Sequence, residues 1–237
     1  TIQLNGGDNY GEGGAGDDRI KGGSGSDSIR GGAGDDTIAS GGGDDNVSGG
    51  DDADIFVINE GHGNDTISGG EGGSDSDTID MTHMSSAVTV TYTGNEAGTI
   101  VDNGDTITFS GIEALKTGSG DDSIDAGNDS VGALLDAGAG SDTIIGGAGD
   151  DHITTGTGSD VVVMETSGGR DSIADFDLSD DDGDGFFRDQ LDVSDLTGAL
   201  GDFLVAPPTD VVVSDDGIGN AVLTFPGGEQ LVMKGIT

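Results

Sequence analysis

The chain has 237 residues, of which 49 are Gly, 47 are Asp or Glu and 7 are Lys or Arg, so its formal net charge is −40. With 31% hydrophobic residues, such a chain is either disordered or stabilised by bound cations that neutralise its acids. The charge argues against a nucleic-acid partner, the absence of Cys excludes disulfides and Cys zinc sites, and no apolar run is long enough for a transmembrane segment.

A nine-residue repeat fills the first third of the chain. Residues 13–21 read GGAGDDRIK, residues 22–30 read GGSGSDSIR and residues 31–39 read GGAGDDTIA. Further units follow at 40–48, 49–57, 60–68 and 72–80. The shared pattern is G-G-x-G-x-D-x-U-x, where U is a large aliphatic residue. An acidic Gly-rich linker is not expected to keep Asp and the aliphatic residue in one phase, so the repeat indicates a repetitive fold.

The period is interrupted between residues 81 and 116. The segments VTVTYTG (88–94), GTIVDNG (98–104) and DTITFSGIE (105–113) alternate between apolar and polar residues and are separated by turn residues. This alternation is typical of half-buried strands. We therefore predict a small antiparallel β insert.

The repeat returns at residue 117. Residues 117–125 read TGSGDDSID, an irregular unit of eleven residues occupies 126–136, and regular units cover 137–145, 146–154, 155–163 and 166–174. These units predict a second stack of repeats.

The C-terminal region departs from the repeat. Asp180, Asp182 and Asp184, followed by Gly185, form the D-x-D-x-D-G start of an EF-hand-type calcium loop. Leu191 stands where such a loop needs Glu, so Asp189 or Asp192 would have to substitute; the alternative is a solvated acidic loop. Residues 210–236 contain three apolar segments that predict an antiparallel β cap over the end of the stack.

The repeat itself predicts the fold. The x-U-x part suits a short strand with U pointing inward, and the G-G-x-G-x-D part suits a tight turn that needs Gly. Two units complete one coil, so residues 18 apart stack. We predict an all-β, right-handed parallel β-roll in two stacks. The predicted parts are a first stack (1–80), the β insert (81–116), a second stack (117–176), and an acidic calcium loop with a β cap (177–237).

Stacked turns also predict metal sites. They align Asp carboxylates and turn carbonyls, the hard oxygen ligands that Ca²⁺ prefers. The phase places Asp18, Asp36, Asp54 and Asp77 on one edge and Asp27, Asp45 and Asp65 on the other. In the second stack, Asp142 should pair with Asp160, Asp151 with Asp171, and Asp122 should stand below Asp142. The irregular unit has no Asp at the aligned position, so a site is not expected there.

The units GGAGDDRIK, GGSGSDSIR, GGAGDDTIA and GGAGDDHIT (146–154) closely resemble the nonapeptide of the RTX (repeats-in-toxin) family. This resemblance implies a calcium-dependent fold with several Ca²⁺ ions, about ten. It implies that the chain is a region of a larger protein that a type I secretion apparatus exports from a Gram-negative bacterium. The protein would be secreted or located at the cell surface, and the calcium domain would serve its secretion and stability.

Two other functions compete with this interpretation. One is an adhesin segment, or a module binding a neutral polysaccharide or a protein, for which the insert is the candidate surface. The other is an enzyme using the insert and the acidic loop, but neither H-E-x-x-H nor G-x-S-x-G is present, so we predict no catalytic activity in this chain. Of the histidines, His62 and His152 are expected to be exposed, and His83 is expected to pack with Met81 and Met84.

Overall fold

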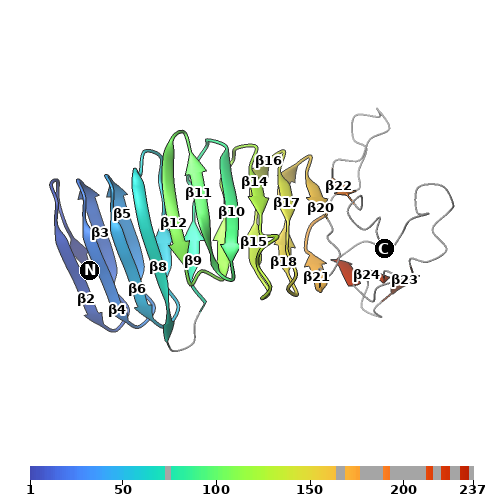
Figure 1. Ribbon diagram of the computed structural model, residues 1–237, viewed down its shortest axis with the longest axis horizontal. Helices are drawn as coiled ribbons and strands as arrows, with labels where there is room; N and C mark the ends of the chain where they lie inside the picture. Colours follow the sequence, from blue (N-terminus) through green and yellow to red (C-terminus); the bar gives the residue numbers. More distant parts are fainter. Residues whose placement is uncertain are drawn as a thin grey trace.

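The computed structural model describes residues 1–72, 76–163, 169–176 and 189–192, and the strands at 212–215, 220–224 and 230–234. Within this part of the chain there are 25 strands and no helix. The strands stack along one axis from the N-terminus to the C-terminus, as Figure 1 shows. The fold is therefore an all-β parallel solenoid, as the nine-residue period predicts.

Two large sheets form opposite walls of the solenoid. Sheet A has twelve strands in the order β1 (Ile2–Gln3), β3 (Arg19–Ser24), β5 (Thr37–Gly42), β7 (Ile55–Val57), β9 (Thr78–Asp80), β13 (Ala114–Lys116), β15 (Leu134–Asp136), β18 (His152–Thr154), β21 (Arg170–Ile173), β25 (Gln230–Lys234), β24 (Asn220–Thr224) and β23 (Val212–Asp215).

Sheet B has eleven strands in the order β2 (Tyr10–Ala15), β4 (Ser28–Ala33), β6 (Asn46–Asp51), β8 (Asn64–Gly72), β12 (Asp105–Ser110), β11 (Ala97–Asp102), β10 (Val88–Gly94), β14 (Ser123–Asp125), β17 (Thr143–Ile145), β20 (Val161–Val163) and β22 (Gln190–Asp192). A short third sheet joins β16 (Ala139–Gly140) to β19 (Thr157–Gly158).

The core lies between the two walls and consists of the aliphatic residue of each repeat. In sheet A, Ile20 pairs in register with Ile38, which is 18 residues later, and Ile38 pairs with Phe56. Each repeat side chain is no more than 2% exposed, which confirms the predicted core positions: Ile20, Ile29, Ile38, Val47, Phe56, Ile67, Ile79, Ile124, Leu135, Ile144, Ile153, Val162 and Ile173.

The insert is built into sheet B. Strands β10, β11 and β12 pair antiparallel with each other, while β12 pairs parallel with β8 and β10 pairs parallel with β14. Tyr92 and Phe109 pack edge to face, with ring centroids 5.2 Å apart. Gly98 lies against the Phe109 ring and the Tyr92 backbone, because a Cβ there would be 2.8 Å from Phe109 Cζ and 2.9 Å from Tyr92 Cα. The insert thus adds aromatic packing that the repeats lack.

The two runs of repeats share both sheets. The insert joins them within sheet B, and β9, β13 and β15 join them within sheet A. Strand β13, at 114–116, therefore belongs to the solenoid wall, although its sequence was assigned to the insert. At the far end, β25 pairs parallel with β21, and β23 and β24 extend the sheet antiparallel. The proposed boundaries at 80, 116 and 176 remain a prediction.

Candidate metal sites

In most coils the repeat Asp ends the turn directly before a strand, whereas Asp65 and Asp171 are the second residues of β8 and β21. In the coil that ends at β5, Asp36 Oδ1 accepts a hydrogen bond from the backbone N–H of Asp18, at 2.7 Å. Asp18 lies 18 residues earlier, in the coil below. The carboxylate therefore fastens one coil to the next through its first oxygen, which explains why a short acidic side chain is required at this position.

The same hydrogen bond recurs along both edges of the solenoid. Each donor is the backbone N–H of the preceding Asp in the column, and the observed order is the one predicted from the spacing. The steps run from Asp27 to Asp45, Asp36 to Asp54, Asp45 to Asp65, Asp54 to Asp77, Asp122 to Asp142, Asp142 to Asp160, and Asp151 to Asp171.

The second carboxylate oxygen is in a different environment. In seven repeat Asp residues, Oδ2 is buried and has neither a hydrogen-bond nor an ion-pair partner: Asp27, Asp36, Asp45, Asp122, Asp142, Asp151 and Asp160. A buried, unpaired carboxylate oxygen carries a large free-energy cost unless a cation or a donor compensates it. A row of such oxygens at one phase of a repeat therefore indicates a row of cation sites.

For three of these residues, Asp27, Asp36 and Asp151, glycine at the first position of the repeat leaves space for the oxygen. A Cβ on Gly31 would lie 2.2 Å from Asp36 Oδ2 and 2.7 Å from the carbonyl oxygen of Gly49, in the next coil. The same space at Gly22 is bordered by Asp27 Oδ2 and the carbonyl oxygen of Ser40. A carboxylate oxygen from one coil and a carbonyl oxygen from the next thus converge where a side chain is absent.

This donor set fits a calcium ion. No group of three or more His, Cys, Asp or Glu side chains in the described residues has the arrangement of a metal site, so an ion would take much of its coordination from main-chain carbonyls. All of these donors are hard oxygens, which Ca²⁺ accepts in a flexible shell of six to eight. Zinc instead requires nitrogen or sulfur ligands in most of its sites.

Comparison with known families decides the identity of the repeat. The profile described as "RTX calcium-binding nonapeptide repeat (4 copies)" matches residues 3–38, 21–56, 61–74, 107–130 and 134–162, which together make up just over half of the chain. The chain belongs to this RTX family. RTX repeats bind Ca²⁺, so the chain is a calcium-binding repeat domain, and the family is structural rather than catalytic.

Among solved structures, the chain is similar to the extracellular lipase LipA from Serratia marcescens, with 20% sequence identity and a TM-score of 0.31. The match covers 90% of this chain and 38% of the lipase chain. No curated protein matches the sequence. Within the described residues, no helix is long and apolar enough to cross a membrane.

Two acidic residues extend the RTX columns and were not predicted as repeat positions. Glu113 Oε2 accepts a hydrogen bond from the backbone N–H of Asp77 at 2.6 Å, and Asp189 Oδ1 accepts one from Asp160 at 3.1 Å. Each stands two residues before a core aliphatic residue, Leu115 and Leu191. Of the nine-residue pattern, only this acid-x-aliphatic spacing is present at these two positions. The spacing is the sequence signal by which Glu113 and Asp189 could have been predicted.

Other predicted positions have different outcomes. In the irregular unit, Ala133 takes the place of the repeat Asp, and its N–H donates to Asp151 Oδ1 at 2.9 Å; the expectation of no site there stays a prediction. Asp180, Asp182 and Asp184 lie outside the described residues, so the EF-hand-type loop stays a prediction.

Burial shifts the titration of the repeat carboxyls. It raises the pKa of Asp142 and Asp171 to about 7 and that of Asp45, Asp151 and Asp160 to about 6, although backbone hydrogen bonds act in the opposite direction. Without a cation, these groups hold protons that the unfolded chain has already released at the same pH. If these carboxylates are the calcium ligands, protons compete with Ca²⁺ for the same oxygens.

This competition predicts an inverted pH dependence in the absence of calcium. A raised folded-state pKa contributes stability below the unfolded value, about 4, and that stability is lost as the pH rises through about 6 to 7. In calcium-stripped buffer, the β signal in circular dichroism should therefore fall across this window, whereas saturating Ca²⁺ should remove the fall. A β signal that rises with pH in calcium-stripped buffer would contradict the assignment.

The expectations for all three histidines were wrong. His62 is 1% exposed, and its Nδ1 lies 3.6 Å from Asp65 Oδ2. Burial acts to lower the pKa of His62, but the contact with Asp65 and the charges of Asp105 and Asp102 outweigh it, so the pKa is raised. The insert places Asp102 and Asp105 near this turn. The position of His62 within its repeat does not predict this contact.

The second wrong expectation concerns His83. Met81 and Met84 are buried in the core as expected, but His83 is exposed, and its Nδ1 lies 3.4 Å from Thr82 Oγ1. The two methionines alone fill the space beside the insert, because their flexible side chains adapt to an irregular part of the core.

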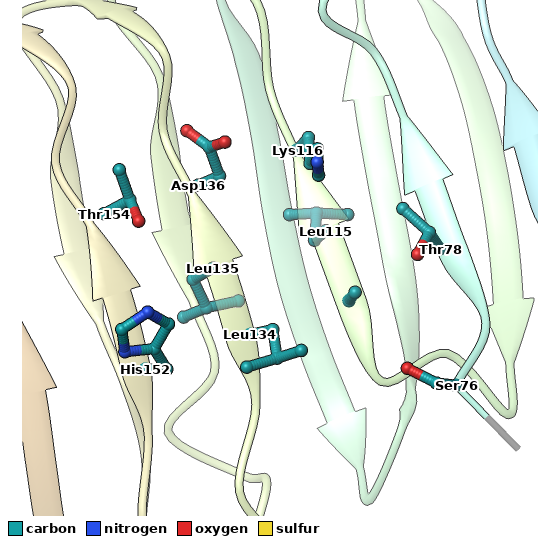
Figure 2. Close-up of a pocket in the computed structure, with 10 residues that line it drawn as sticks. Ser76, Thr78, Leu115, Lys116, Leu134, Leu135, Asp136, His152 and Thr154 are labelled. Carbon is teal, nitrogen blue, oxygen red and sulfur yellow. The ribbon is translucent and has the colours of Figure 1, made fainter. Parts of the chain in front are cut away.

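A shallow hollow of about 340 Å³ lies on the outer face of sheet A across β9, β13, β15 and β18 (Figure 2). His152 lines it and is half-buried rather than exposed; its Nδ1 is 3.0 Å from Ser172 Oγ. His152 and Ser172 are register neighbours on β18 and β21, so cross-strand geometry accounts for their contact. Leu134 is 44% exposed at the same hollow.

Proposed function

We propose that this chain is a calcium-dependent folding domain of a larger secreted protein of a Gram-negative bacterium. The observation that supports the proposal is the double column of buried Asp Oδ2 atoms without hydrogen-bond partners, of which those of Asp27, Asp36 and Asp151 face space left by a glycine. The proposed ligands are the repeat Asp residues, together with Asp180, Asp182 and Asp184 of the acidic loop.

The column geometry supports folding outside the cell. Where calcium is scarce, the stacked carboxylates repel one another and the chain stays unfolded, which suits passage through a type I secretion apparatus. Extracellular calcium modules bind with Kd values of roughly 10⁻⁴–10⁻³ M. At a calcium concentration of tenfold Kd, each independent site adds about 1.4 kcal/mol to the free energy of unfolding. Adjacent sites share coils, so their contributions are coupled, and folding should be steep in calcium concentration.

The test is a comparison of Ca²⁺ and Mg²⁺ by isothermal titration calorimetry, with circular dichroism on the same samples. Calcium should bind at several sites per chain and produce the β signal. Magnesium demands near-ideal octahedral geometry and releases its water reluctantly, so equal concentrations should leave the chain largely unfolded. Absence of calcium binding, or equal folding by magnesium, would overturn the proposal.

A further inference from the structure

The insert presents a face of uncharged, hydroxyl-bearing side chains. Along β10, β11 and β12, burial alternates: Val90, Ile100 and Ile107 point into the core, and the residues between them point outward. We define the threonine face as nine outward residues selected from these strands and from β8: Thr66, Thr89, Thr91, Thr93, Thr99, Val101, Thr106, Thr108 and Ser110.

Strand register orders this face into rows. Thr66 pairs with Thr108, Thr108 with Thr99, and Thr99 with Thr91, so four threonines stand side by side across four strands. Neighbouring strands are about 4.8 Å apart, and alternate residues on a strand are about 6.7 Å apart. Figure 1 shows these strands side by side in the middle of the stack. The result is a regular two-dimensional array of hydroxyl and methyl groups.

The composition of the threonine face is unusual for this chain. None of its nine residues is charged, although 47 of the 237 residues are Asp or Glu. An ionic partner therefore finds no counter-charge on it. It also has no aromatic residue and no Arg, the anchors that carry most of the binding energy at protein interfaces. Its only exposed large apolar side chain is Val101, at 44%.

We propose that the threonine face binds an uncharged polysaccharide. Threonine hydroxyls can both donate to and accept from sugar hydroxyls, while the Thr methyls and Val101 can contact the C–H faces of the rings. Each such hydrogen bond contributes only about 0.5–1.5 kcal/mol net. Binding therefore depends on many contacts repeated along a polymer, and monosaccharides should bind negligibly. The inference rests on the proposed function, because the array exists only in the folded chain.

The test is co-sedimentation of the calcium-loaded chain with cellulose, chitin and agarose particles. The wild-type chain should bind at least one of them. Thr99→Glu, which places a charge at the centre of the face, should reduce binding at least tenfold, whereas Thr99→Ser should retain it. The matched control is Thr154→Glu, which adds the same charge on the outer face of sheet A. Excess monosaccharide should not compete.

Circular dichroism of each variant in calcium separates the two proposals. If the chain folds with calcium but binds none of the three polymers, or if Thr99→Glu binds as well as the wild type, the inference is wrong and the proposed function stands. If calcium does not fold the chain, the proposed function itself fails. Self-association in analytical ultracentrifugation that Thr99→Glu abolishes would assign the face to a second copy of the chain and would also overturn the inference.

Discussion

In excess chelator at neutral pH, the chain is expected to lose most of the β signal in its circular dichroism spectrum and to regain it when calcium is restored. The expected change is close to complete, because the columns of Asp oxygens run along both edges of the solenoid. The measurement is a reversible calcium titration at fixed ionic strength, followed in the far ultraviolet.

Two properties of the fold explain why the loss of β signal in chelator should be large. Each regular repeat buries one aliphatic side chain between the sheets, so the core is thin outside the insert. A thin core leaves the entropy of ordering nine residues largely uncompensated. The formal net charge of −40 adds repulsion to the folded state that the more expanded unfolded chain largely avoids. At the proposed sites calcium would oppose both effects, since it would link adjacent coils and neutralise the carboxylates.

Monovalent salt provides the control. Raising NaCl shortens the Debye length to about 3 Å at 1 M and weakens repulsion between exposed acids, but it cannot coordinate the buried Oδ2 atoms. We therefore expect salt to restore little of the β signal in chelator. An equal β signal with chelator and with calcium would show that the core alone suffices, and that the unpaired oxygens are tolerated.

Sequence periodicity was sufficient to predict the pairing of the coils. Asp36 and Asp54 are 18 residues apart and stack as expected, and the step of 20 residues from Asp122 to Asp142 still brings both into one column. The extra residues are absorbed in the turns, because the hydrogen bond fixes only the Asp and the strand after it. The fixed spacing between the repeat Asp and the following strand therefore sets the strand register even where the length of the repeat varies.

The nine-residue period could not predict contacts between residues far apart in the sequence. His62 is buried because the insert brings Asp102 and Asp105 to its turn, and nothing near residue 62 encodes that approach. Glu113 continues a column with a longer side chain and without the Gly-rich turn, so a search for the full nonapeptide misses it. The threonine face likewise depends on the order β8, β12, β11, β10, which alternation within single strands does not determine.

Substitution of Asp36 by Asn is expected to have opposite effects with and without calcium. Asn can still accept the hydrogen bond from the Asp18 N–H through its amide oxygen, but it replaces the Oδ2 beside Gly31 with a neutral NH₂ group. With saturating calcium, the free energy of unfolding should fall by about 1–3 kcal/mol, and the calcium midpoint should rise. In calcium-stripped buffer at mildly acidic pH, the variant should be as stable as the wild type or more so, because one buried charge is gone.

The adjacent residue supplies a matched control. Asp35 is exposed, and its Oδ1 accepts a hydrogen bond from the Ala53 N–H at 3.2 Å. Asp35→Asn removes the same charge one residue away and keeps an acceptor, so its calcium midpoint should match that of the wild type. If both variants shift the midpoint equally, general charge reduction rather than coordination explains the calcium dependence. A shift confined to Asp36→Asn, with the sign reversed in the absence of calcium, is the signature expected of a ligand, because a structural hydrogen bond alone would respond alike in both conditions.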